Sequence, residues 1–172
     1  MGCCRCCCII LLTSVIIIGF SLGFFAGFFP YPTHASCKVT WQFGRPCKQV
    51  KDALINQIKE WSSNSCSSKQ QCGYEYYGED GNTIRGKRRT PVLKFVDSFN
   101  FTFESNGIGC KVEGVSASDA WYAVVDFGYN YCNLKNLVIG SRLDERDPAY
   151  EEESSNSICT MYSIAHCNLY SE

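Results

Sequence analysis

The chain has 172 residues, of which 45% are hydrophobic and 19% charged, and its formal net charge is −1. This length suits one domain of ordinary size, and the composition excludes a disordered, collagen-like or coiled-coil chain. Because acidic and basic residues balance, no global positive field attracts nucleic acid, and nucleic acid is not expected as a partner. Cysteine is the unusual component, with 13 residues that call for a redox explanation.

The first feature along the chain is an uncharged apolar run over residues 9–29. A helix of this length covers about 30 Å, which matches the hydrocarbon core of a bilayer. Pro30 and Pro32 follow at once and would end the helix. The run therefore predicts a transmembrane helix, so that the membrane itself is one expected partner.

Two interpretations of this run stay open. In the first it is an uncleaved signal-anchor: Arg5 favours a cytoplasmic stub over residues 1–8, and a juxtamembrane linker over 30–36 leads to a luminal or extracellular domain. The protein would then lie in the cell membrane or a membrane of the secretory pathway. In the second, a signal peptide is cut between Ala35 and Ser36, and the protein is secreted.

The cysteines form two groups, one on each side of the apolar run. The first group faces the reducing cytosol and contains candidates for S-palmitoylation, although small apolar side chains that extend the run are the alternative. Its members are Cys3, Cys4, Cys6, Cys7 and Cys8. The second group is even in number and lies in an oxidising compartment, which predicts disulfides whose pairing the sequence leaves open. Its members are Cys37, Cys47, Cys66, Cys72, Cys110, Cys132, Cys159 and Cys167.

The spacing of these cysteines does not favour a metal site. Zinc sites typically contain closely spaced pairs such as C-x2–4-C, and the second group has none. We therefore expect neither a metal nor another cofactor.

Residues 37–140 predict an α+β domain in which one amphipathic helix packs on an antiparallel sheet. The helix is expected over 47–61, where Val50, Leu54, Ile58 and Trp61 recur at helical spacing. Alternating or β-rich runs predict the strands, with turn signals at 79–82 and at Asn106-Gly107. These runs are 37–43, 73–77, 83–90, 92–96, 98–103, 111–115 and 121–125.

Two further segments complete the domain. Leu134, Leu137 and Val138 indicate a short helix that ends near Gly140. The polar segment over 141–172 has little apolar surface of its own, so we expect Cys159 and Cys167 to tether it through disulfides.

Asn100-Phe101-Thr102 is an N-glycosylation sequon, and its asparagine falls on the polar face of a predicted strand. Asn100 is therefore a candidate glycosylation site, and an unused sequon is the alternative.

Residues 83–137 resemble a domain family of unknown function that is best known from bacteria and plastids. Three motifs carry the resemblance: a strand that ends in Phe95-x-Asp97, the turn Ser116-x-Ser118, and Asp126-x-Gly128-x-Asn130 before a helix. The chain departs from the family at 119–121, where a basic residue and a glycine are usual, and in the helix, where only Lys135 remains of an Arg-rich pattern. The resemblance implies a fold unit and no established chemistry.

The same motifs supply the candidate ligand-binding residues Ser116, Ser118, Asp126 and Asn130. Asp126 and Asn130 would lie at a helix N-terminus, where they either form part of a ligand or anion site or cap free N–H groups. No His-based or paired-carboxylate signature accompanies them, so no catalytic residue is assigned.

Arg85, Lys87, Arg88 and Arg89 form a basic patch, which either binds an anionic group or is a solvated strand face.

Together these features favour a single-pass membrane-anchored protein whose luminal or extracellular domain is a non-enzymatic binding or interaction module. The alternatives are a secreted disulfide-rich protein and a small enzyme with a site near residues 126–130. A pocket that gathers Asp126, Asn130 and Ser116 would favour the enzyme, whereas a closed core there would favour the binding module.

Overall fold

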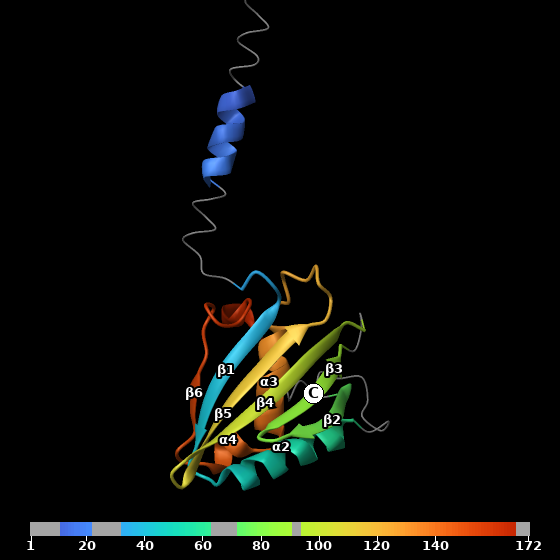
Figure 1. Ribbon diagram of the computed structural model, residues 1–172, viewed down its shortest axis with the longest axis vertical. Helices are drawn as coiled ribbons and strands as arrows, with labels where there is room; N and C mark the ends of the chain where they lie inside the picture. The colour runs from blue at the N-terminus through green and yellow to red at the C-terminus, as the bar shows by residue number, and fades with distance from the viewer. Residues whose placement is uncertain (1–10, 22–31, 63–71, 91–93, 168–172) are drawn as a thin grey trace, which may run out of the picture. The chain divides into compact units, whose positions relative to one another are not determined.

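The computed structural model describes residues 11–21, 32–62, 72–90 and 94–167 (Figure 1). The chain divides into two compact units, Met1–Pro30 and Tyr31–Glu172. In the first unit, residues 11–21 form a helix. Within the described ranges, no helix is long and apolar enough to cross a membrane. The run predicted to span the membrane, 9–29, extends beyond 11–21 at both ends, and the palmitoylation candidates at 3–8 lie outside the description altogether.

The second unit is built on one six-stranded sheet in which every pair of neighbours is antiparallel. The strand order is β2-β3-β4-β5-β1-β6. The strands are β1 (Ser36–Phe43), β2 (Tyr74–Asp80), β3 (Thr83–Arg89), β4 (Val96–Asn106), β5 (Gly109–Ser118) and β6 (Glu151–Glu153). The predicted α+β class with an antiparallel sheet is therefore confirmed.

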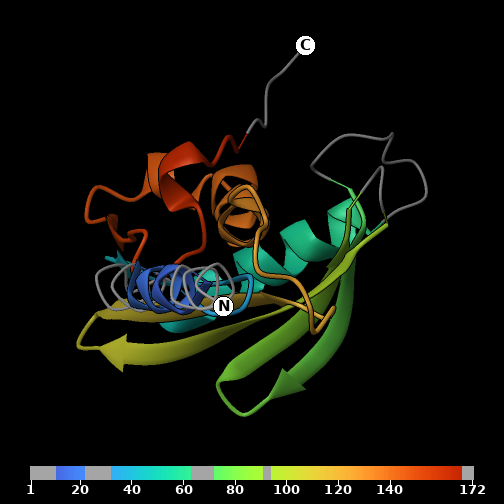
Figure 2. The same ribbon diagram turned by 90° about the horizontal axis from the view of Figure 1, so that it is seen from above.

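Two helices cover one face of this curved sheet, as Figure 2 shows. The amphipathic helix α2 (Cys47–Trp61) has the predicted bounds and buries Val50, Leu54 and Ile58. Helix α3 (Tyr129–Gly140) crosses β5 and β1. The opposite sheet face is solvated, which is usual for an antiparallel sheet with one covered face.

Side chains of β4 point alternately into the hydrophobic core and toward solvent. Phe99, Phe101 and Phe103 are all buried, as their shared strand face predicted. The ring of Phe101 lies 6.0 Å from those of both Trp41 and Phe99. Burial of large aromatic side chains is the main stabilising term in a domain of this size.

Both predicted turns join neighbouring strands. Gly81 between β2 and β3 has φ 58°, and Gly107 between β4 and β5 has φ 62°. A left-handed backbone of this kind favours glycine, so these two positions fix the hairpins and their register.

The run at 121–125 was predicted to be a strand and is instead part of an exposed loop between β5 and α3. Strand β5 already has β4 and β1 as its two neighbours, so a chain leaving β5 has no free edge beside it to join. The β-rich composition of 121–125 therefore does not produce a strand. Of the run at 92–96, only Val96 belongs to β4, and residues 91–93 lie outside the description.

The C-terminal segment packs against the sheet rather than forming a separate tail. It contains α4 (Leu143–Arg146), then β6, which pairs with β1, and the 3-10 turn η1 (Tyr162–Ile164). Three disulfides join Cys37 to Cys159, Cys47 to Cys110 and Cys132 to Cys167. Cys72 is also disulfide-bonded, and Cys66 is not among the described residues.

Candidate functional site

One largely buried hydrogen-bond cluster, which we call the polar network, contains the four candidate ligand-binding residues. Its members are Ser116, Ser118, Asp126 and Asn130, together with Arg88, Asp97 and Asn133. Ser116 Oγ donates to Asn130 Oδ1 at 2.7 Å. Asn130 Nδ2 donates to Asp126 Oδ2 at 2.8 Å and to Ser118 Oγ at 3.3 Å. Ser116 and Ser118 lie on β5 and Asn130 lies in the first turn of α3, so the network ties this helix to the sheet.

Asp126 organises the entry into α3. Its carboxylate accepts hydrogen bonds from Gly128 N at 3.1 Å and from Asn130 N at 2.9 Å. Burial raises the pKa of Asp126, against the opposing effect of the hydrogen bonds from Asn130 and Gly128. These contacts correspond to helix capping, one of the two interpretations left open by the sequence.

Three further residues belong to the polar network: Asp97 and Asn133, which the sequence did not single out as candidates, and Arg88, which it placed in the basic patch. Asn133 Nδ2 donates to Asp97 Oδ2 at 2.8 Å and to Ser116 Oγ at 3.2 Å, and its Oδ1 accepts from Arg88 Nη1. Ser118 Oγ donates to the other oxygen of Asp97 at 2.8 Å. All three are buried, so each charge is compensated inside the fold.

Signals for two of these residues were present in the sequence. Asp97 is the aspartate of the Phe-x-Asp motif, and Arg88 alternates with Arg85, Lys87 and Arg89 along one strand. Asn133 carries no comparable pattern, because a single asparagine in a helix gives no indication of what it faces.

Tyr74 packs against the polar network at Asn133 and Arg88. Its hydroxyl donates to the carbonyl oxygen of Asn133 at 2.9 Å, and the Arg88 guanidinium lies 5.4 Å from the centre of its ring. Burial raises the pKa of Tyr74 to about 12, so the phenol stays neutral at physiological pH.

The polar network is thus a closed core rather than a pocket. Ser116, Asn130 and Asn133 are fully buried, and their side chains hydrogen-bond to one another and to carboxylates. Within the described part of the chain, no group of three His, Cys, Asp or Glu residues is arranged to hold a metal ion. The polar network joins β3, β4 and β5 to α3 and thereby stabilises the packing of this helix on the sheet.

The basic patch divides into two environments. Arg85, Lys87 and Arg89 lie on the solvated face of the sheet, whereas Arg88 points into the core and does not belong to a surface patch. The three surface cations have carboxylate partners, which come from β2 and from the loop after β5. The ion pairs are Arg85–Asp80 at 3.1 Å, Lys87–Asp119 at 2.8 Å and Arg89–Glu75 at 3.8 Å.

The glycosylation candidate Asn100 lies at the centre of β4, between Arg85 of β3 and Val115 of β5. It is half-buried on the face opposite the three phenylalanines, which is the polar face expected from the sequence.

A second charged cluster centres on Glu152 of β6. Its carboxylate accepts hydrogen bonds from Tyr131 at 2.6 Å, Tyr150 at 2.6 Å and Lys135 at 2.9 Å. The indole N–H of Trp41 donates to it at 3.0 Å. Burial by itself raises the pKa of Glu152, but the hydrogen bonds outweigh burial and lower the pKa to about 2.

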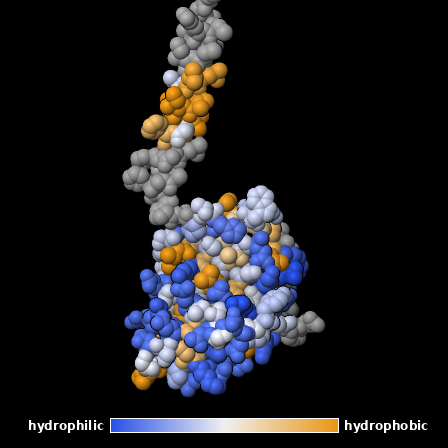
Figure 3. All heavy atoms as spheres, in the orientation of Figure 1, coloured by the Kyte–Doolittle hydropathy of each residue, from blue (hydrophilic) through white to orange (hydrophobic). Residues whose placement is uncertain are grey.

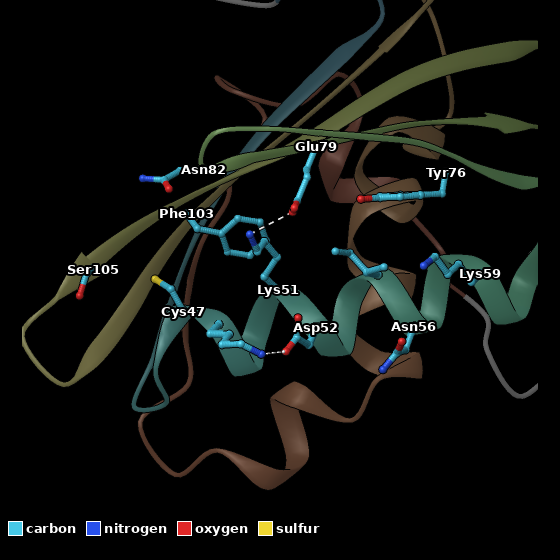
Figure 4. Close-up of a pocket in the computed structure, with 12 residues that line it drawn as sticks. Cys47, Lys51, Asp52, Asn56, Lys59, Tyr76, Glu79, Asn82, Phe103 and Ser105 are labelled. Carbon is cyan, nitrogen blue, oxygen red and sulfur yellow. Dashed lines mark hydrogen bonds and ion pairs between the residues drawn. The ribbon is translucent and has the colours of Figure 1, made fainter.

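An open groove lies between α2 and the β2–β3 and β4–β5 hairpins (Figure 4). Its volume is about 780 Å³, within the range of ligand-binding clefts. Ile55, Tyr76 and Phe103 supply its apolar part, and Lys48, Lys51 and Lys59 its positive charge.

The lysines of this groove have weak partners. Lys48 pairs with Asp52 at 2.8 Å, and Lys51 with Glu79 at 3.0 Å. Lys59 Nζ lies 5.3 Å from the centre of the Tyr76 ring. Such solvent-screened pairs contribute little to stability, so an anionic ligand can displace them at little cost.

No family model, curated protein or solved structure matches this chain. The resemblance over residues 83–137 therefore stays a prediction. Its motif residues Asp97, Ser116, Ser118, Asp126 and Asn130 are those that meet in the polar network.

Proposed function

We propose that this protein is a single-pass, membrane-anchored binding module whose domain over residues 32–172 lies on the luminal or extracellular side. The binding surface in this proposal is the open groove along α2, and the ligand combines an apolar part with a negative charge. The observation that carries binding over catalysis is the closed polar network: the residues considered for an enzyme site are sealed from substrate by their own hydrogen bonds.

Three observations support the membrane anchor and its orientation. The helix over residues 11–21 carries no charge and is mostly apolar on the side drawn in Figure 3, and its large apolar side chains are exposed. A helix that is apolar all round needs an apolar environment. The seven described cysteines are all disulfide-bonded, which is typical of an oxidising compartment.

The third observation concerns the competing cleavage after Ala35. Ala35 is fully buried, its N–H donates to the carbonyl of Ala123 at 2.8 Å, and its own carbonyl accepts from Ser118 N at 3.0 Å. A cut between Ala35 and Ser36 would remove these contacts, which lie immediately before β1. The fold therefore supports an uncleaved chain.

The anchor is tested with the full chain expressed in microsomes. We expect the chain to resist extraction by alkaline carbonate and residues 32–172 to resist added protease until detergent is present. Glycosidase treatment should lower the mass of the wild type and leave Asn100→Gln unchanged if the sequon is used. A mature N-terminus at Ser36, or release by carbonate, would show that the anchor proposal is wrong.

The groove is tested in the same membranes with a photo-crosslinking amino acid at Asn56, which is exposed in the groove. We expect an adduct at this position and none at Thr102, a control that is also exposed and lies on the opposite sheet face. Lys59→Glu should abolish the adduct, and Lys38→Glu outside the groove should not. Absence of an adduct at Asn56, or an adduct indifferent to Lys59→Glu, would contradict the groove as the binding surface.

A further inference from the structure

The loop between β5 and α3 exposes an unusual concentration of large apolar side chains, which we call the aromatic loop (residues 119–128). Trp121 is 86% exposed, Phe127 65% and Tyr122 63%. Val124 and Val125 are more than half exposed as well. Contiguous apolar surface of this kind marks an interaction site, because a soluble surface rarely keeps it facing water.

The aromatic loop is held in a defined conformation. The carbonyl of Ala123 accepts from Ala35 N at 2.8 Å, and Ala123 N donates to Ala120 O at 2.9 Å. At its far end Asp126 fixes the backbone of Gly128 and Asn130. The exposed side chains therefore project from an ordered backbone, so the loop loses little backbone conformational entropy when it binds a partner.

Each charged side chain of the loop already has a partner within the domain, so binding would not bury an unpaired charge. The Asp126 carboxylate is buried in the polar network. Asp119 pairs with Lys87 at 2.8 Å and accepts from Ser98 Oγ at 2.6 Å. From residue 120 to 125 no ionised side chain occurs. The exposed surface of this loop is thus supplied mainly by tryptophan, tyrosine, phenylalanine and valine side chains.

The position of the loop indicates its partner. The chain enters the domain through the linker residues His34 and Ala35. They hydrogen-bond to the carbonyl oxygens of Ser118, just before the loop, and of Ala123, within it. In Figure 1 the start of β1 and the loop before α3 lie at the same end of the sheet. From Phe29, the last apolar residue of the proposed anchor, to Ala35 the chain covers at most about 20 Å even when fully extended.

We infer that the aromatic loop is a membrane-contact site that inserts Trp121, Tyr122 and Val124 into the interface of the same bilayer that holds the anchor. The inference rests on the proposed anchor over residues 9–29. Tryptophan and tyrosine are the side chains enriched at the level of lipid headgroups, where the ring is buried and its polar atom stays hydrated. This second attachment fixes the orientation of the domain above the membrane and leaves the groove along α2 accessible.

The test uses the full chain reconstituted in phosphatidylcholine vesicles, with and without lipids brominated close to the headgroup. Brominated acyl chains quench tryptophan fluorescence only at short range. The protein has three tryptophans, of which Trp41 is fully buried in the core and Trp61 is partly buried. We expect quenching in the wild type and in the control Trp61→Phe, and loss of most of this quenching in Trp121→Phe.

A carbonate wash of the same vesicles separates the two proposals. If the chain is retained but Trp121 is not quenched, the membrane-contact site is wrong and the anchor stands. If carbonate releases the chain, both proposals fall. Because Trp121 is 86% exposed, Trp121→Phe should keep the fold, and an unchanged thermal transition by circular dichroism verifies this. A second variant, Val124→Asp, should reduce the quenching of Trp121 by placing a charge in the interface.

Discussion

At the scale of single residues, Asn133 is the side chain on which the polar network depends. Among the hydrogen bonds described above, those of Asn133 alone connect the buried charges of Arg88 and Asp97. An amide suits this place because its oxygen accepts from the cation while its nitrogen donates to the carboxylate. Neither charge meets water, so the amide substitutes for solvent.

We expect Asn133→Ala to destabilise the domain by about 2–3 kcal/mol, because it removes the amide that hydrogen-bonds to both Arg88 and Asp97 in the core. Denaturant unfolding of the full chain measures this loss. Asn56→Ala, the same substitution at an exposed position of α2, should change the stability by only about 0.5 kcal/mol. Equal effects of the two substitutions would contradict the role of Asn133.

Glu152 makes the stability depend on pH in the acid range. Its pKa is lowered from 4.5 to about 2 in the folded state. An acid with a depressed folded pKa stabilises the fold above its unfolded pKa, and this contribution disappears as pH falls toward the folded value. Such a shift corresponds to about 3 kcal/mol at neutral pH.

The wild type should therefore be more stable than Glu152→Gln at pH 6, and the difference should shrink between about pH 4.5 and about pH 2. Thermal unfolding followed by circular dichroism across this range measures it. Glu153→Gln, next to it and exposed, serves as the control and should show no such trend. A difference that is constant with pH would mean that Glu152 does not titrate as described.

At the scale of elements, α3 is buried on several sides. The sheet, α2 and α4 all contact it, so apolar and polar residues alike lie inside. At its C-terminal end Gly140 lies against the indole of Trp61: a Cβ there would come within 2.5 Å of Trp61 Cη2. The close approach of α2 and α3 thus depends on the absence of a side chain at Gly140.

We expect Gly140→Ala to destabilise the domain by about 1–3 kcal/mol through this clash. Helix propensity acts in the opposite direction, since alanine is favoured over glycine by about 1 kcal/mol in a helix. In the background Trp61→Ala only the contact with the flexible side chain of Gln57 at 3.0 Å remains, so the same substitution should become close to neutral or stabilising. A double-mutant cycle on thermal stability measures the coupling, and additive effects would argue against the contact.

At the scale of the whole molecule, the disulfides connect segments that are distant in sequence. Cys37–Cys159 closes a separation of 122 residues, Cys47–Cys110 one of 63 and Cys132–Cys167 one of 35. A disulfide that closes a longer loop removes more conformational entropy from the unfolded chain, so Cys37–Cys159 should stabilise the fold most. Both of its cysteines are also fully buried, on β1 and next to it.

Under mild reduction we expect Cys132–Cys167 to open before Cys37–Cys159, because Cys167 is partly exposed while Cys37 and Cys159 are shielded. Timed alkylation with mass spectrometry gives the order, and limited proteolysis should then cut first near residues 160–167. A chain that loses Cys37–Cys159 first would contradict this account of the C-terminal segment.

Much of the fold was predictable from local patterns. The stripe of α2 and the alternation of β4 each report burial directly, because the same face repeats along the element. The turn glycines likewise fixed two hairpins through a backbone conformation that other residues disfavour. For the candidate site, the motifs named Ser116, Ser118, Asp126 and Asn130 but gave no sign that they close on one another.

By itself, the sequence determined the apolar N-terminal run, the α+β class, the hairpins and the presence of disulfides, since each depends on residues that are near in the chain or on composition. The tertiary structure alone decided which cysteines pair and that Asn133 bridges Arg88 and Asp97. It also decided that residues 121–125 form an exposed loop and not a strand. These outcomes depend on which strand edges are already occupied and on which distant side chains supply the missing hydrogen bonds. Such relations between remote segments leave no local pattern along the chain.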